Sequence, residues 1–566
     1  MTGTAEPVPL DEVDRSVSVL PVAGQALVVN TLVDLLRLDP SLDLRERAPN
    51  GVQTDLSIRG GSFGQTLVLL NGQRLNDAQS GHHNMDIPVP LESVSRIEVL
   101  RGSGSALYGS DAVGGVINIV TEPPERTEVR LRTAVGNFGV NQQRGTIAGA
   151  WKRISEQLVF SRDFSSGFRP DRDYRNLSLA SSTHLASPLG ATDITAAWSD
   201  RSFGADQFYG PANSWENTKA WFASIRQALG ARTSAAFTYR RHSDLFVYYR
   251  DRPWISTNHH EDESYQASLR RTDSLWRSAS LFYGIEGLRE SVRSTNLGVR
   301  ARNRGAAYAS LDVRALRRFS FSLAAREEVY GGLSSVLSPS VSGAVWLNSR
   351  LKLRAAVSKA FRIPSYTDLY YHDPSNLGNP NLRPERAWSY EAGLDWNSGG
   401  KVRLDLTVFQ RRERDGIDYI RRSAQDIWQA ANIQNFRFTG VEAGVSLRPA
   451  RAQQIDMRYT GLRGAQRELE GLMSKYVFNY PSDSAVVGWQ AALPAGLLLR
   501  TRLGALNRRA RDPYAVWDLY LASTHGRLHP FLQLTNISNT NYQEVVGIVM
   551  PGRAAVAGIE IAWARR

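Results

Sequence analysis

The sequence of 566 residues contains no cysteine and no long apolar run. The absence of cysteine excludes a disulfide framework, a thiolate metal site and a cysteine nucleophile. The longest clean apolar runs are pieces such as 66–70 (TLVLL), whereas a membrane-spanning helix needs roughly 18 consecutive apolar residues. A helical membrane protein is therefore excluded. The first 20 residues also lack the basic start and apolar core of a secretory signal, which indicates either mature numbering or an intracellular chain.

Enzyme motifs are also missing. We find no Ser/His/Asp order, no H-E-x-x-H and no paired-carboxylate motif, so we expect neither an enzyme nor a cofactor. The net charge of +13 favours an anionic partner, but the basic residues are dispersed along the chain and not gathered in one arm. A basic soluble all-β protein that binds nucleic acid or polysaccharide therefore stays as an alternative, and it predicts solubility without detergent.

Residues 1 to about 125 combine short strand-like pieces with turns. The pieces are 55–59, 66–70, 96–100 and 115–120. Asn71-Gly72, placed between two of these apolar segments, predicts a hairpin with a type I′ turn. Leucines near helical spacing in 29–44 predict a short helix that ends at Pro40. This region is expected to form a compact α+β domain.

From about residue 126 the apolar residues alternate strictly with polar ones. The segment 402–410 (VRLDLTVFQ) sets Val402, Leu404 and Leu406 against polar neighbours, and 351–359, 531–536 and 556–563 repeat the pattern. About 22 such segments follow one another at intervals of about 20 residues, which fits strands of roughly 10 residues joined by turns and loops. Because the apolar faces carry aromatic residues near their ends, the pattern predicts a transmembrane β-barrel more than a sandwich or propeller.

Two long stretches of the N-terminal region resemble the plug domain of TonB-dependent outer-membrane receptors: 58–77 (IRGGSFGQTLVLLNGQRLND) and 91–121 (LESVSRIEVLRGSGSALYGSDAVGGVINIVT). Segments 358–371, 378–396, 435–447 and 534–553 continue the resemblance, which within the family is greatest to the cobalamin receptors. It implies a periplasmic segment at 1–25, a plug at 26–125 and a barrel of 22 antiparallel strands at 126–566. Two segments depart from the family: 6–13 (EPVPLDEV) is a poor match to the TonB-contacting box, and the chain ends IAWARR and not on an aromatic residue.

The resemblance also implies how the plug is held. Arg59 and Arg101 match the plug arginines of the family, and Glu391 and Glu442 match its inward-facing barrel carboxylates. Buried bidentate pairs between them would form a plug–barrel lock. Such a plug is needed because a barrel of 22 strands encloses a lumen wide enough to leak.

The stretch 80–88 (SGHHNMDIP) follows the predicted hairpin and, in a plug of this family, lies in an apical loop that faces the ligand. Gln79, Ser80, His82, His83 and Asn84 are the candidate ligand-binding residues there. In an extended loop the two histidines would point to opposite sides. The alternative is a polar loop that only packs against the barrel wall.

The resemblance leaves the ligand open. A cobalamin-like chelate is favoured, with a siderophore or another chelate as an alternative. Tyr370, Tyr371 and His372 are further candidate ligand-binding residues. Haem is a further alternative, because His372 lies between 361–364 (FRIP) and 379–382 (NPNL), where haem receptors carry a histidine. A transition metal is also considered, with His259 and His260 as weak candidate ligands and no firm metal site.

The expected partners follow from the same resemblance. They are TonB of the inner membrane, a chelate ligand, and the lipid and lipopolysaccharide of the bacterial outer membrane around a monomeric barrel. Nucleic acid is not expected. The excess Arg and Lys are expected in the lumen, in loops and at the headgroup boundary, where they meet anionic lipid.

Overall fold

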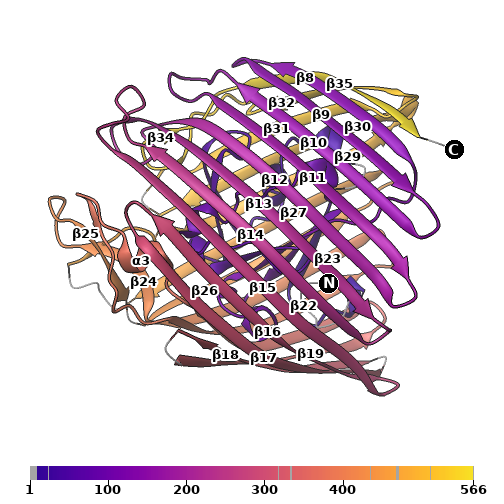
Figure 1. The fold of residues 1–566 in the computed structure, drawn as a ribbon. Helices are drawn as coiled ribbons and strands as arrows, with labels where there is room; N and C mark the ends of the chain where they lie inside the picture. Colours follow the sequence, from indigo (N-terminus) through magenta and orange to yellow (C-terminus); the bar gives the residue numbers. More distant parts are fainter. Residues whose placement is uncertain are drawn as a thin grey trace.

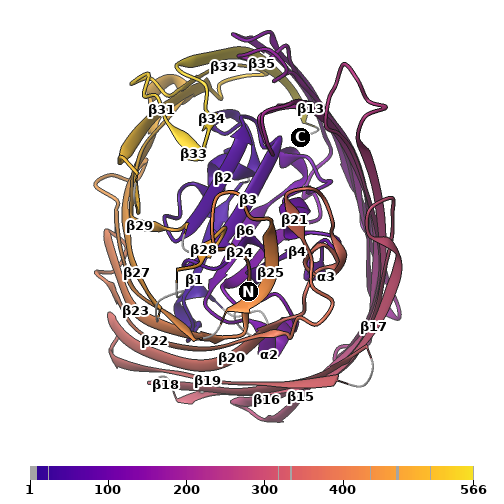
Figure 2. The same cartoon turned by 90° about the vertical axis from the view of Figure 1, so that its left-hand side faces the viewer.

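The computed structural model describes residues 9–22, 25–316, 318–331, 334–433, 435–466, 471–477, 479–509 and 511–564. A closed β-barrel surrounds a smaller mixed domain, the plug (Figure 1). Viewed along its axis in Figure 2, the barrel is a ring with the plug strands inside it. None of the helices in the described part of the chain has the length and apolarity needed to cross a bilayer.

Within the described residues, 22 antiparallel strands form the barrel, and the last pairs with the first to close it, with Val556 opposite Gly136. The strands are β8 (Glu128–Gly136), β9 (Val140–Ala150), β10 (Ile154–Ser165), β11 (Tyr174–Ser187), β12 (Gly190–Asp206), β13 (Asn213–Leu229), β14 (Thr233–Val247), β15 (Thr257–Trp276), β16 (Ala279–Ser294), β17 (Gly298–Leu316), β18 (Phe319–Tyr330), β19 (Ser334–Asn348), β20 (Leu351–Arg362), β22 (Glu385–Asn397), β23 (Val402–Arg414), β26 (Phe436–Leu447), β27 (Gln453–Gln466), β29 (Pro481–Leu493), β30 (Leu497–Arg508), β31 (Tyr514–Ser523), β32 (Leu528–Thr535) and β35 (Ala554–Ala564).

The predicted alternation is confirmed in the barrel wall. On β23, Leu406 and Val408 face outward with exposed fractions of 44% and 52%, whereas Thr407 between them faces the lumen and is buried. Outward apolar and inward polar side chains are what lipid outside and a polar lumen require. The alternative of a soluble basic β-protein is therefore wrong, because such a surface would expose a continuous apolar band to water.

The two ends of the barrel differ in the length of their connections. At one end the turns are short, and at the other the connections are long and contain additional elements; long loops mark the extracellular end. The additional elements are α3 (Tyr366–Tyr370), β21 (Asn376–Leu377), β24 (Gly416–Arg421), β25 (Trp428–Ile433), β28 (Met473–Ser474), β33 (Gln543–Val545) and β34 (Ile548–Val549). The strands β21, β25, β24 and β28 form one sheet, hereafter the loop sheet, which in Figure 2 lies across the mouth of the ring.

The barrel wall is not equally tall around the ring. Strands β12 to β17 contain 15 to 20 residues, whereas β30, β31, β32 and β35 contain 8 to 12. Aromatic residues lie opposite one another on the taller wall, in the pairs Trp198–Trp221 and Tyr239–Tyr265. Such pairs form the aromatic girdle that marks a lipid headgroup boundary.

The plug contains a five-stranded sheet in the order β1-β6-β7-β4-β5, a β2–β3 hairpin and short helices. Its elements are η1 (Leu10–Glu12), β1 (Val17–Pro21), η2 (Ala26–Val28), α1 (Leu32–Leu36), β2 (Leu42–Ala48), β3 (Gln53–Ile58), η3 (Phe63–Gln65), β4 (Thr66–Leu70), β5 (Gln73–Arg74), η4 (Gly81–His83), η5 (Leu91–Ser93), β6 (Arg96–Arg101), α2 (Ser105–Tyr108) and β7 (Gly115–Val120), where η denotes a 3-10 helix; η6 (Pro494–Gly496) lies in a barrel turn. Branched aliphatic residues of the sheet form one buried core with α1.

The predicted hairpin at Asn71-Gly72 is confirmed. Leu70 pairs with Gln73 across a two-residue turn in which both φ angles are positive, 52° and 78°. The predicted short helix is α1, whose first turn is closed by reciprocal hydrogen bonds between Thr31 and Asp34.

The predicted boundary between a periplasmic segment and the plug, at residue 25, is wrong in part. β1 pairs with β6 along its length, and Ser18 and Leu20 are buried, so the plug sheet already begins at Val17. A strand of five residues is too short for its alternation to stand out in the sequence. Of the proposed TonB-contacting segment 6–13, residues 6–8 lie outside the described residues, as do Arg565 and Arg566 of the unusual C-terminus.

Candidate ligand-binding site

The histidine pair lies in the plug loop that follows β5 and reaches the extracellular connections of the barrel. The carbonyl groups of Ala78 and Gln79 accept hydrogen bonds from the backbone amides of Tyr366 and Thr367 in α3, at 3.0 Å each. The predicted apical position of this loop therefore agrees with its contacts. We call residues 77–86 the apical loop.

The extended conformation expected for the apical loop is wrong. The loop is wound into a turn. The carboxylate of Asp77 accepts the backbone amides of Gln79 (2.8 Å) and Ser80 (3.2 Å), and the Ser80 hydroxyl accepts the amide of His82 (3.3 Å). These bonds wind Gly81–His83 into the single helical turn η4. Short polar side chains at such positions favour a turn by binding nearby amides.

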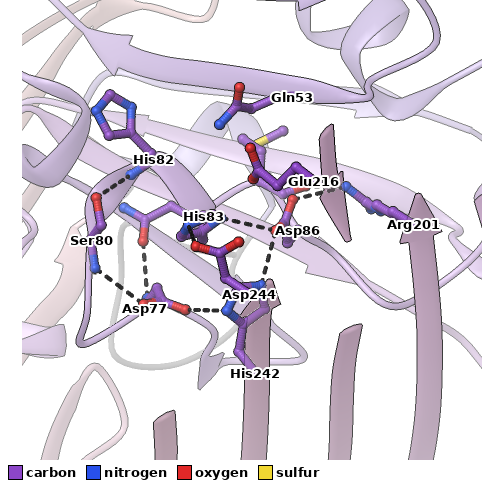
Figure 3. A network of polar contacts seen from close by, with 12 residues as sticks. Gln53, Asp77, Ser80, His82, His83, Asp86, Arg201, Glu216, His242 and Asp244 are labelled. Atoms are coloured by element: carbon purple, nitrogen blue, oxygen red, sulfur yellow. Dashed lines mark hydrogen bonds and ion pairs between the residues drawn. The ribbon is translucent and has the colours of Figure 1, made fainter. Parts of the chain in front are cut away.

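His82 and His83 nevertheless have different surroundings (Figure 3). The Nδ1 atom of His82 lies 2.6 Å from Asp55, and its ring stacks on Phe63 with centroids 4.1 Å apart. Burial lowers the pKa of His82, and the Asp55 carboxylate opposes this shift. With 19% of its side chain exposed, compared with 6% for His83, His82 is the more accessible histidine of the pair.

His83 points toward the barrel wall and lies between two carboxylates. Its Nδ1 atom is 3.2 Å from Asp86 and its Nε2 atom is 3.5 Å from Asp244 of β14. Burial alone would lower the pKa of His83, but the two carboxylates raise it well above its usual range. His83 therefore joins the plug to the wall.

The other three predicted residues of the apical loop use their polar groups within the protein. Gln79 donates to Asp244 (3.4 Å), and Ser80 caps η4. The side-chain oxygen of Asn84 accepts the amide of Asp77 (3.0 Å), and its amide group donates to the Phe63 carbonyl (3.2 Å). All three are buried, so in this conformation they shape the loop.

Tyr370, Tyr371 and His372 lie at the end of α3. The two tyrosines are half-buried and pack against a cluster that includes Ala78 of the apical loop, and the Arg300 guanidinium lies 4.3 Å from the Tyr370 ring centroid. His372 is exposed, and its backbone is held by the side chain of Asn296. The structure thus brings the tyrosines to the apical loop and leaves the imidazole of His372 at the surface.

The aromatic residues above the apical loop were not predicted from the sequence. The Tyr476 ring lies 5.2 Å from Phe63 and 6.0 Å from His82, both edge to face. Asp418 of β24 fixes this segment by accepting the backbone amides of Tyr476 and Val477. These residues come from connections that have no periodic pattern, and nothing in the sequence alone marks them.

Lys475 brings a cation to this aromatic group. Its Nζ atom lies 5.2 Å from the ring centroid of Tyr476, 5.4 Å from that of Tyr419 and 5.9 Å from that of Trp428. Burial lowers the pKa of Lys475 to about 8, against the raising effects of Asp373 and Asp418. The loop sheet therefore offers an ammonium donor among rings, which suits a ligand that combines apolar surface with hydrogen-bond acceptors.

The predicted plug–barrel contacts are present for one of the two arginines. Arg59 donates from Nε and Nη2 to the two oxygens of Glu442, at 2.7 Å each, and from Nη1 to Glu391 at 2.8 Å. The prediction for Arg101 is wrong, because its guanidinium binds Asp39 of the plug (2.5 Å) and Ser41 (2.9 Å) instead of a barrel carboxylate.

His259 and His260 do not form a metal site together. They are neighbours on β15 and therefore face opposite sides of the wall: His259 is exposed, and His260 is buried with Nδ1 2.7 Å from the Ser294 hydroxyl. No grouping of potential metal ligands among the described residues contains either histidine.

A cavity of about 190 Å³ lies between the plug and the wall formed by β29 to β35, β8 and β9. Arg37, Glu46, Arg502, Tyr520 and Glu544 are among its lining residues. Because pockets for drug-sized ligands measure roughly 300–1,000 Å³, a large chelate does not fit this cavity.

Two family models match the chain. "TonB dependent receptor-like, beta-barrel" matches residues 129–537, and "TonB-dependent Receptor Plug Domain" matches residues 9–116. The chain belongs to the TonB-dependent receptor family. Membership implies a transporter of the outer membrane that works with TonB, and it supports the expectation that the protein is not an enzyme.

The similar proteins include a vitamin B12 transporter and a siderophore receptor. The chain is 25% identical over 532 residues to the vitamin B12 transporter BtuB of Photobacterium profundum, covering 88% of this chain and 85% of that protein. It is 26% identical over 482 residues to the iron-regulated outer membrane virulence protein of Vibrio cholerae, covering 74% and 70%. The crystal structure of the siderophore receptor PirA from Acinetobacter baumannii has a TM-score of 0.78 at 15% identity, covering 97% and 98%, which shows the shared fold alone.

Proposed function

We propose that the protein imports a large, scarce chelate of the cobalamin type across the outer membrane, driven through TonB. The observation that carries the transport mechanism is the filled lumen: the plug occupies the barrel and is held by buried polar contacts such as Arg59–Glu442. A ligand bound at the mouth cannot diffuse past it, so passage needs work on the plug.

The side chains at the extracellular mouth favour a ligand that has both apolar and polar surface. His82, Phe63 and Tyr476 form an aromatic group on the plug side, and Lys475 with Trp428 extends it into the loop sheet. A corrinoid presents amide side chains that accept hydrogen bonds and an extended apolar ring. The similarity to vitamin B12 transporters favours this class.

Binding to detergent-purified protein tests the ligand class. Cyanocobalamin, haem and a ferric siderophore are titrated in parallel while tryptophan fluorescence is followed. We expect tight binding of cyanocobalamin that His82→Ala and Lys475→Ala each weaken by tenfold or more, about 1.4 kcal/mol. His525→Ala, an exposed histidine in a turn at the opposite end of the barrel, is the matched control and should bind as the wild type does.

Haem or a siderophore is the second candidate, and His372 is the observation that favours haem. Its imidazole is exposed at the mouth and is available for iron. Binding of haem that His372→Ala removes, without binding of cyanocobalamin, would replace the cobalamin proposal. In either case, uptake of the bound compound by cells should stop when TonB is deleted.

A further inference from the structure

A group of buried acidic residues lies where the apical loop meets the barrel wall (Figure 3). It consists of Asp77 and Asp86 of the loop, Glu216 of β13, Asp244 of β14 and Asp262 of β15. Two guanidinium groups pair with three of these carboxylates: Arg201 with Asp86 (3.1 Å), and Arg240 with Asp77 (2.8 Å) and Asp262 (2.7 Å). Glu216 and Asp244 pair with no guanidinium group in the part of the chain that the structure describes.

These two carboxylates are deeply buried and incompletely satisfied. Glu216 is 2% exposed and Asp244 is 5% exposed, and one oxygen of each, Oε1 and Oδ1 respectively, has no hydrogen-bond partner among the described residues. Their second oxygens are used: Tyr209 donates to Glu216 Oε2 (3.1 Å), and Gln79 donates to Asp244 Oδ2 (3.4 Å). Buried carboxylates of this kind are normally paired or coordinate a cation.

His83 completes a set of three possible ligands. Its side chain and those of Glu216 and Asp244 each offer one atom, and these atoms lie within 4.8 Å of one another. The separation of His83 Nε2 from Asp244 Oδ2 is 3.5 Å, close to the edge of about 3.4 Å in a tetrahedron around zinc.

The surroundings of His83 resemble those of a metal-binding histidine. Its Nδ1 atom faces Asp86 at 3.2 Å, and Asp86 is fixed in turn by Arg201 and by His242 Nε2 at 3.0 Å. A carboxylate behind the imidazole orients the ring and raises the basicity of the nitrogen that binds the metal. Asp86 is therefore a positioning residue for Nε2.

We propose that His83, Glu216 and Asp244 bind one divalent transition-metal ion of the Zn²⁺ class, which ties the apical loop of the plug to strands β13 and β14 of the barrel. One imidazole nitrogen and two carboxylates suit Zn²⁺, whereas Ca²⁺ takes oxygen ligands. The dication would neutralise the two carboxylates that lack a guanidinium partner. This inference goes beyond the import of a chelate, and its test requires neither a chelate nor TonB.

Calorimetry on the full-length protein in detergent, stripped of metal with EDTA and dialysed, tests the site. We expect about one Zn²⁺ per chain at micromolar affinity or better, and no heat with Ca²⁺. Glu216→Gln and Asp244→Asn keep the side-chain shape and should each weaken Zn²⁺ binding at least tenfold. His259→Ala, a histidine of β15 on the outer face of the wall, should leave it unchanged. A folded barrel migrates faster on a gel before boiling than after it, so this difference in mobility reports whether each variant is folded.

A second measurement does not depend on any variant. Co²⁺ bound to nitrogen and carboxylate ligands in a four-coordinate site gives visible absorption bands, and added Zn²⁺ should abolish them. Absence of Zn²⁺ binding to the folded wild type, or equal affinity in the wild type and both acid-to-amide variants, would overturn the proposal. The group would then be a hydrogen-bonded network in which a cationic His83 bridges Asp86 and Asp244.

Discussion

Arg59 joins the plug directly to the barrel wall. It has a positive φ of 51°, uncommon outside glycine, and its guanidinium is buried between Glu442 and Glu391 with the Phe409 ring 4.1 Å away. Gly102 approaches so closely that an added Cβ would lie 3.1 Å from Arg59 and 3.2 Å from Glu391. The backbone at Arg59 and Gly102 therefore packs closely against this ion-pair group.

Removal of Glu442 should loosen the plug. Glu442→Ala leaves the Arg59 guanidinium buried with one carboxylate fewer, and breaking a buried pair in this way costs about 3–5 kcal/mol. We expect the urea concentration at which the purified protein opens a conducting channel in a planar bilayer to fall markedly. Arg226→Ala removes an exposed pair with Asp193, worth roughly 0–1 kcal/mol, and should leave the midpoint unchanged. Equal midpoints for Glu442→Ala and wild type would mean that the plug is held elsewhere.

Sequence similarity predicted the partners of Arg59 but not those of Arg101. Arg101 is satisfied by Asp39, which lies 62 residues earlier in the chain and carries no motif of its own. The proposed metal site was missed for the same reason: Glu216 and Asp244 are single polar residues in alternating strands, where most inward positions are polar. Only the docking of the plug brings them to His83.

At the scale of elements, ion pairs and a backbone hydrogen bond join β33, in an extracellular connection, to β2 and to the C-terminal end of α1 in the plug. Arg37 contacts both Glu46 of β2 (2.7 Å) and Glu544 of β33 (2.7 Å), and the backbone amide of Glu46 donates to Glu544 (2.7 Å). Burial raises the pKa of Glu46 to about 7, helped by Glu544 and Asp34 and opposed by Arg37. Glu46 is thus protonated in the folded protein at pH values where it is ionised in the unfolded chain.

This contact should weaken as the pH rises. Because the pKa of Glu46 is higher in the folded state than its usual 4.5, its contribution to stability is complete below pH 4.5 and is lost as the pH passes through about 7. We expect a lower urea midpoint at pH 8 than at pH 6, measured by proteolysis of the connection 536–553. Glu46→Gln should lose most of that difference, and a difference that persists in this variant would assign the effect to other groups.

The outward face of β23 offers a test of the lipid boundary. Val408 lies midway along the strand and is 52% exposed on the outer face. Val408→Arg should destabilise the folded barrel by about 2–4 kcal/mol, the cost of an arginine near the bilayer midplane. The midpoint of guanidine-induced unfolding in liposomes measures this cost. Arg403→Lys, near the periplasmic end of the same strand, should change it little.

The barrel strands could be predicted from the sequence because alternation is a local pattern that burial on one face enforces over ten or more residues. The loop sheet could not, because β21, β24, β25 and β28 come from three connections and contain 2 to 6 residues each. Their pairing depends on contacts between distant segments. The same reason left Tyr476 and Lys475 outside the predicted site.

At the scale of the whole molecule, transport requires the plug to move within a closed ring. The native chain has no cysteine, so an engineered pair would form the sole disulfide. Val113 of the plug and Ala360 of β20 pack in one buried cluster. The double variant Val113→Cys/Ala360→Cys should bind its ligand when oxidised but not transport it, and a reductant should restore uptake into cells. Unimpaired uptake by the oxidised protein would mean that this part of the plug stays in place.

The unequal height of the wall sets the outline of the mouth. On β15 eight residues, Thr257–Ser264, continue beyond the girdle residue Tyr265, whereas on β31 three residues, Tyr514–Val516, continue beyond Trp517. At roughly 3.3 Å per residue along the strand, one rim stands well above the other. The opening is therefore oblique, and a bulky solute has a shorter path to the plug over the low rim than over the high one.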